Sequence, residues 1–274
     1  MDAAAQEIEG QKGETPQEDP RLEIYTAQYV EYYDRVLAET FPEFHTGQAA
    51  RALELSMKLA KQRAEERIRI EDEGEIDRLT QLPTRNGFMK RFNERLLTFA
   101  RRLRESDQER PITPGPIIFL DLDNFKIAND ESEDKHTFGD EVLKAVGRIL
   151  LQAKRPNDIV GRYGGEEFAI FLEGESLEGG LAAAERFRSK IEAGVASNQT
   201  TAGYLQTASF GIAMLPSDLT ETSLQDPIFR ETLFITTFRQ ADLALYHAKN
   251  NGRNTVGYIL PDGTPTIYQD DIKT

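Results

Sequence analysis

Residues 162–172 read Arg162-Tyr163-Gly164-Gly165-Glu166-Glu167-Phe168-Ala169-Ile170-Phe171-Leu172. The apolar second half of this stretch and the apolar pair Ile159-Val160 before it predict two strands, and a Gly-Gly pair between strands is typical of a hairpin. Glu166 and Glu167 therefore lie at a bend. Adjacent carboxylates repel each other, and a divalent cation, which prefers oxygen ligands, offsets that repulsion. A solvated acidic turn is the alternative that these residues alone leave open.

The composition of the 274-residue chain indicates one globular domain with an additional segment, since 39% of the residues are hydrophobic and 29% are charged. No apolar run approaches the roughly 18 residues of a membrane span, and the N-terminus lacks a signal-peptide pattern. We therefore expect no membrane span and a cytoplasmic location. Cysteine is absent and there are 3 histidines, so any bound metal should have oxygen ligands.

The net charge of −14 is concentrated at the N-terminus. Residues 1–75 contain 9 basic and 18 acidic side chains, whereas the rest of the chain contains 24 and 29. An acidic surface repels a phosphate backbone, which argues against a nucleic-acid partner. The near balance beyond residue 75 is compatible with a local basic cluster that holds a small anionic substrate.

The N-terminal quarter divides into a tail and a helical region. Residues 1–20 are polar and show no periodicity, which predicts disorder. Residues 21–76 are expected to be helical and to serve dimerisation or signal input. Thr46 is a candidate cap for a second helix, in which apolar residues recur at spacings of four and three. A short coiled coil and a helix packed on its own domain both remain open; the residues of this seam are Leu53, Met57, Ala60 and Ala64.

Residues 77–260 alternate between helical and extended patterns, and residues 261–274 are expected to form a tail. The expected helices cover 86–104, 139–151, 181–191 and 233–249. Besides the two strands that flank the Gly-Gly pair, the expected strands cover 116–122, 204–214 and 255–259. This order predicts an α/β (α+β) domain, in which helices pack on a central sheet.

A second acidic pair ends the strand expected at 116–122. Asp121 and Asp123 are followed closely by Lys126. If Asp121 faces Glu166 and Glu167, the acids form a multi-carboxylate site of the kind that two-metal phosphoryl transfer requires. An ordinary charged turn is the alternative.

Six motifs in order make the chain resemble the diguanylate cyclase family, whose GGDEF or GGEEF domains make cyclic di-GMP. The resemblance covers roughly residues 77–258 and implies a polymerase-palm or nucleotidyl-cyclase-like sheet with surrounding helices. The motifs are DRLTQLPTR at 77–85, DLDNFKIAND at 121–130, GDEVL at 139–143, RYGGEEF at 162–168, SFGIA at 209–213, and ADLALYHAK with GRN between 241 and 254.

The resemblance implies a metal site. Asp121, the backbone carbonyl of Leu122, Glu166 and Glu167 would hold two Mg²⁺ ions, or Mn²⁺ in their place, against the triphosphate of GTP. Glu166 would also be the general base for the attacking 3′-hydroxyl.

The resemblance also implies a substrate site. Lys126 would stabilise charge that develops on the phosphates, and Lys249 and Arg253 would grip their far end. Cations at a helix C-terminus are favoured in any case, which is the alternative for the last two. Asn129 and Asp140 would read guanine, because an aspartate accepts from the N1 and N2 donors that adenine lacks. The segment between these two residues departs from the family's pattern by two extra residues.

A separate motif, Arg155-Pro156-Asn157-Asp158, lies upstream of Gly164. It matches the family's inhibitory site, where Arg155 and Asp158 would bind the product cyclic di-GMP, with a contribution from Arg186. A plain helix end is the alternative.

These features predict a homodimeric diguanylate cyclase that condenses two GTP into cyclic di-GMP and two diphosphates and is inhibited by its product. Two alternatives remain open: a catalytically silent domain that is a receptor for cyclic di-GMP, and a cyclase of different nucleotide specificity.

Overall fold

The computed structural model describes residues 20–40, 54–65, 67, 74–105, 113–126, 135–197, 201 and 204–269. The chain divides into two compact units, Met1–Asp72 and Glu73–Thr274. Some expectations lie outside the described residues: the tail before residue 20, the cap Thr46, the seam residue Leu53, Asn129 and the extra segment 131–134.

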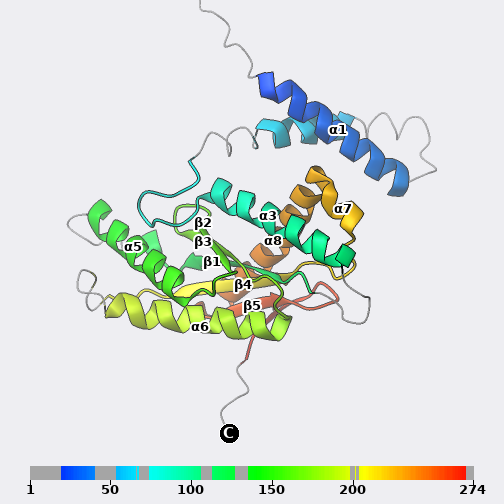
Figure 1. Ribbon diagram of the computed structural model, residues 1–274. Coiled ribbons are helices and arrows are strands. Elements are labelled where there is room, and N and C mark those ends of the chain that lie inside the picture. Colours follow the sequence, from blue (N-terminus) through cyan, green and yellow to red (C-terminus); the bar gives the residue numbers. More distant parts are fainter. Residues whose placement is uncertain are drawn as a thin grey trace, which may run out of the picture. The chain divides into compact units, whose positions relative to one another are not determined.

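The N-terminal unit contains helix α1, Pro20–Thr40, and a second helical segment at 54–65 and 67. The guanidinium of Arg67 lies over the ring of Tyr25, 4.0 Å from its centroid. This cation–π contact brings the end of the second segment against α1 (Figure 1).

The buried side of the second segment differs from the expected seam. Ser56, Ala60 and Ala64 are buried, whereas the side chain of Met57 is 54% exposed. A spacing of four residues places the three small residues on one helix face, and Met57 lies on another. Met57 thus does not pack within this unit, and the short coiled coil between two copies stays a prediction.

A six-stranded sheet in the order β2-β3-β1-β4-β5-β6 forms the centre of the second unit (Figure 1). Neighbouring strands are antiparallel, except that β4 and β5 are parallel. This confirms the expected α/β class with a central sheet. The strands are β1, Pro116–Leu122; β2, Ile159–Arg162; β3, Glu167–Phe171; β4, Ala208–Met214; β5, Val256–Ile259; and β6, Pro265–Ile267.

Helices cover both faces of the sheet. Side chains alternate between the two faces along each strand, so Ile118 and Leu120 join one core and Ile117 and Phe119 join the other. The first core includes residues of α5 and α6, and the second includes residues of α3, α7 and α8. These helices are α3, Arg85–Glu105; α5, Lys135–Ala153; α6, Leu177–Ala196; α7, Glu221–Gln225; and α8, Pro227–Asn250.

Helices α5, α6 and α8 begin earlier than expected, and caps explain the last two starts. Ser176 Oγ accepts a hydrogen bond from the backbone of Gly179 and starts α6, and Asp226 caps α8 with proline at its first turn. The short elements α7 and β6 were not expected. Since β6 pairs with β5, the chain as far as residue 267 belongs to the sheet, where a tail was expected from residue 261.

Helix α8 lies directly on β4 and β5. A Cβ atom at Gly211 or Gly257 would collide with the backbone of α8, so glycine is required for this close approach. The contact fixes the height of α8 above the sheet. None of the described helices is long and apolar enough to cross a membrane.

Candidate active site

The strand register brings the acids of the turn to the end of β1. Asp121 lies opposite Glu167 of β3 on one side and opposite Ser209 of β4 on the other. Directly opposed residues have Cβ atoms about 5 Å apart on the same face of a sheet. The N–H of Leu122 also donates to the carbonyl of Glu166, at 3.3 Å. The four proposed metal ligands therefore lie at one end of the sheet.

The carboxylates share an environment that disfavours negative charge. Burial raises the pKa of Asp121, against a hydrogen bond from Lys249 that lowers it. Burial also raises the pKa of Glu166 and of Glu167, and the negative charge of Asp121 raises both further. Lys126 and Lys249 oppose this effect at Glu166. A cation brought among these acids would relieve their repulsion.

The donor atoms of these residues suit a divalent cation, but their side chains are not yet arranged around one. Three carboxylates and a backbone carbonyl are the hard oxygen donors that Mg²⁺ prefers. Within the part of the chain that the structure describes, however, no three acidic or histidine side chains form a ready metal-binding group. Lys249 Nζ lies 2.8 Å from Asp121 Oδ1 instead. Binding of an ion at Asp121 therefore requires the lysine to move or to share the carboxylate.

Arg162 connects the acidic turn to the start of the domain. Its Nη1 lies 3.2 Å from both carboxylate oxygens of Asp77, and its Nε and Nη2 donate to the carbonyl of Gly165 at 3.1 and 2.7 Å. Burial raises the pKa of Asp77, but hydrogen bonds from Thr80 and the charge of Arg162 outweigh burial and lower it. The sequence motif includes Arg162 just before the turn, but the local pattern predicts no role for it.

The two glycines of the turn differ in the space around them. The described glycines with positive φ are Gly115, Gly174, Gly252 and Gly263, so neither turn glycine needs a left-handed backbone. A Cβ at Gly164 would collide with the carboxylate of Glu167, whereas a Cβ at Gly165 would meet open space. The predicted hairpin between β2 and β3 is confirmed, but its connection spans four residues rather than a two-residue turn.

Two exposed cations, Lys126 and Arg253, follow elements that form the site. Lys126 follows β1 and lowers the pKa of Glu166 through its charge. Arg253 lies just beyond the end of α8. Among the described residues, neither side chain has an acid within ion-pair distance. Both are therefore available to an anionic ligand.

The proposed guanine site is only partly described. Asp140 is exposed on α5. Its expected partner, Asn129, lies outside the described residues, so the pairing of Asn129 with Asp140 stays a prediction.

The candidate inhibitory residues form a separate group. The backbone N–H of Arg155 donates to Asp158 Oδ2 at 2.7 Å, and the guanidinium of Arg155 lies 2.5 Å from Glu175 Oε2. Burial raises the pKa of Asp158, against the positive charges of Arg155, Lys154 and Arg186. Arg186 thus lies within electrostatic reach of Asp158. A ligand of Arg155 must compete with Glu175.

Comparisons with known proteins agree with this architecture. Residues 75–255 match the sequence profile of the family described as "Diguanylate cyclase, GGDEF domain". The probable diguanylate cyclase DgcT of Escherichia coli K12 is 34% identical over 180 residues, which are 66% of this chain and 34% of that protein. Diguanylate cyclase DosC of the same strain is 33% identical over 167 residues, 61% of this chain and 33% of that protein. The chain thus spans about a third of the length of these relatives.

A solved structure shows the same fold. The GGDEF domain of DgcB from Caulobacter crescentus, determined in complex with c-di-GMP, superposes with a TM-score of 0.54 and 24% sequence identity. The match covers 68% of this chain and 93% of that domain.

Proposed function

The chain belongs to the diguanylate cyclase, GGDEF domain family, and on that premise we propose that it condenses two GTP into cyclic di-GMP and two diphosphates. One observation carries the proposal: Asp121 lies opposite Glu167 in the sheet, with Lys249 bound to Asp121 and Lys126 beside Glu166. Carboxylates that can bind a metal ion and lysines that can bind phosphates therefore line one site.

The acids have two roles in this proposal. Asp121, the carbonyl of Leu122, Glu166 and Glu167 would hold two Mg²⁺ or Mn²⁺ ions, which polarise the α-phosphorus and neutralise the leaving diphosphate. Glu166 accepts the proton of the 3′-hydroxyl as its oxygen bonds to the α-phosphorus of the other GTP. The bond from that phosphorus to the diphosphate breaks in the same step.

The cations and the guanine ligands orient the nucleotide. Lys126, Lys249 and Arg253 bind the phosphates, and Asn129 with Asp140 recognise guanine. An aspartate left without its guanine donors would be unpaired when ATP binds, which disfavours ATP.

The reaction needs two copies of the chain. Each domain holds one GTP, and the 3′-hydroxyl of each must attack the phosphate of the other, which a symmetric dimer arranges. The N-terminal unit offers exposed apolar side chains for this contact: Leu55 and Leu59, four residues apart on one side of the second helical segment, and Ile24 and Met57 elsewhere.

Product inhibition is the proposed role of Arg155, Asp158 and Arg186. Arg155 would grip a phosphate and a guanine of cyclic di-GMP, and Asp158 would accept from guanine. We place the whole activity in the cytoplasm of a bacterium, because GTP is available there.

One assay separates the proposal from its two alternatives. The full chain at high concentration is incubated with Mg²⁺ and either GTP or ATP, and cyclic dinucleotides are quantified. Cyclic di-GMP from GTP alone is expected. Absence of product with intact binding of cyclic di-GMP would favour a silent receptor, and comparable turnover of ATP would favour a cyclase of different specificity.

A further inference from the structure

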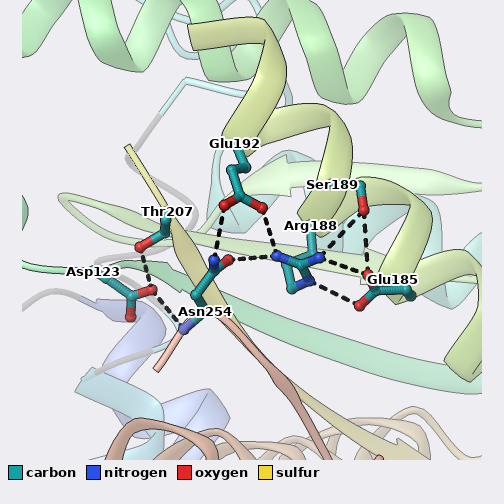
Figure 2. A network of polar contacts seen from close by, with 7 residues as sticks. All are labelled: Asp123, Glu185, Arg188, Ser189, Glu192, Thr207 and Asn254. Atoms are coloured by element: carbon teal, nitrogen blue, oxygen red, sulfur yellow. Dashed lines mark hydrogen bonds and ion pairs between the residues drawn. The ribbon is translucent and has the colours of Figure 1, made fainter. Parts of the chain in front are cut away.

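Asp123, the second acid after β1, is buried and takes no part in the proposed chemistry. Its side chain is held by three donors: Ser209 Oγ at 2.7 Å, Thr207 Oγ1 at 2.8 Å and the backbone N–H of Asn254 at 3.0 Å. Figure 2 shows the last two of these bonds. A buried carboxylate is costly unless it is hydrogen-bonded, so these donors fix its position.

The turn between α8 and β5 has an unusual backbone. Gly252, Arg253 and Asn254 have φ values of 106°, 59° and 45°. Left-handed backbone at two consecutive non-glycine residues is unfavourable and persists only where the surroundings hold it. The N–H of Arg253 donates to the carbonyl of Ala248 at 3.2 Å, which closes the helix end in the manner of a Schellman motif.

The side chain of Asn254 holds the other side of this turn (Figure 2). Its Oδ1 accepts from Arg188 Nη1 at 2.7 Å, and its Nδ2 donates to Glu192 Oε1 at 3.2 Å. Arg188 is itself held by both oxygens of Glu185 and by Glu192, at 2.7 to 2.8 Å. The turn is therefore bound to a fixed cluster on α6.

The segment Asp121–Asp123 at the end of β1 is attached to the last turn of α8 and to the turn that follows it. Asp121 Oδ1 lies 2.8 Å from Lys249 Nζ, and Asp123 Oδ2 accepts from Asn254. Arg253 lies between these two attachments in the chain. Its backbone is thus tied to the strand that carries the proposed metal ligand, while its exposed guanidinium is left to a ligand.

We infer that Asp123 and Asn254 are positioning residues that hold Arg253 toward the phosphates of a bound nucleoside triphosphate. This inference rests on the proposed function. Its specific consequence concerns the phosphate chain: loss of the network should weaken binding of a triphosphate and spare binding of a nucleotide that does not reach Arg253.

The test uses two substitutions of Asn254 in the full chain. Asn254→Ala removes the side-chain bonds and leaves an unfavourable positive φ, whereas Asn254→Gly removes the same bonds but tolerates that φ. Calorimetry with Mg²⁺ measures binding of a non-hydrolysable GTP analogue and of GMP, and hydrogen exchange without nucleotide measures protection of the amides of residues 251–255. We expect both variants to bind the analogue about ten-fold more weakly, to bind GMP within about two-fold of the unmodified chain, and to exchange faster in the turn.

Two outcomes would overturn the inference. If Asn254→Gly binds the analogue normally, the asparagine serves only the backbone conformation; if the affinities for the analogue and GMP fall equally, the network is merely structural. Asp123→Asn, which keeps the size of the side chain, should act in the same direction, and Asn254→Gly decides if Asp123→Asn fails to fold. These binding results do not depend on turnover. An unmodified chain that makes no cyclic di-GMP, yet shows the predicted binding differences, would refute the proposed reaction and leave the positioning role standing.

Discussion

Lys249 Nζ lies 2.8 Å from Asp121 Oδ1, so an ammonium neutralises the acid that the proposed function assigns to a metal ion. Burial raises the pKa of Asp121 and Lys249 lowers it. Lys249→Met should therefore destabilise the metal-free chain by about 1–2 kcal/mol, between the values for exposed and buried ion pairs. This corresponds to a loss of several degrees in Tm for a domain of this size.

Added Mg²⁺ tests whether Lys249 competes with a metal ion for Asp121. In Lys249→Met, Mg²⁺ no longer competes with an ammonium, so it should raise Tm more than it does in the unmodified chain. Thermal unfolding with and without Mg²⁺ measures this difference. Lys90→Met, which removes the exposed Lys90–Glu75 pair, is the control and should leave the Mg²⁺ shift unchanged. Equal shifts in all three proteins would contradict metal binding at Asp121.

Glu166→Gln should abolish turnover while largely sparing the fold. The substitution keeps the shape of a side chain on the turn and removes the charge needed for a metal ligand and a proton acceptor. A decrease in the rate of cyclic di-GMP formation of at least about 10²–10⁴-fold is expected. Asp218→Asn removes an exposed acid beyond the opposite end of β4 and should retain activity. Retained activity in Glu166→Gln would refute its assigned role.

Glu175→Gln should make the enzyme more sensitive to its product. The Arg155–Glu175 pair is partly exposed, and pairs of this kind contribute about 0.2–1 kcal/mol. Removal of the competing acid should thus lower the concentration of cyclic di-GMP for half-inhibition by roughly 1.5- to 5-fold. Arg155→Ala should relieve inhibition. An unchanged inhibition curve in Arg155→Ala would mean that the motif is only structural.

The strands of the sheet and the helices that pack on it could largely be predicted from the periodicity of apolar residues. β1 was predicted with its observed bounds, because an apolar run that ends in acids is unambiguous. The starts of α6 and α8 were missed because Ser176 and Asp226 were not recognised as caps. β6 was missed because three residues, two of them non-apolar, carry almost no periodic signal.

The candidate site could be predicted only in part. The resemblance implied that Asp121 and Glu167 share a site, and the strand register places them opposite each other. The roles of Arg162 and Asp123 arise from hydrogen bonds to residues 85 and 131 positions away. Local patterns contain no information about such pairs. The pairing of Lys249 with Asp121 was also missed, because both residues had been assigned to ligands.

Asp77→Asn should show a pH-dependent loss of stability. The folded pKa of Asp77 is lowered, so its contribution is present above the unfolded value of about 3.9 and is lost as the pH falls through the folded value. At pH 7 the variant should be less stable by about 1.5–3 kcal/mol, the range for hydrogen bonds to a charged group. Chemical denaturation at pH 7, 5, 4 and 3 should show the gap closing in the acid range. A gap that stays constant with pH would exclude the charge as its cause.

Deletion of residues 1–72 should leave a folded domain whose activity depends steeply on protein concentration. The deleted residues form a separate compact unit, so the sheet and its helices should survive. Two copies must meet for turnover, and a dimerising segment raises their effective concentration to about the millimolar range. At about 1 µM protein, specific activity should therefore fall by roughly 10²- to 10³-fold and recover as concentration rises.

A double substitution in the full chain tests, without truncation, whether the N-terminal unit joins two copies. Leu55→Glu combined with Leu59→Glu places charges on the exposed apolar surface of the N-terminal unit. If that surface joins two copies, the double variant should be monomeric in light scattering and should reproduce the concentration dependence of the deletion. A dimeric double variant with normal activity would place the contact elsewhere. A deletion variant with full activity at 1 µM would show that the cyclase domains associate without the N-terminal helices.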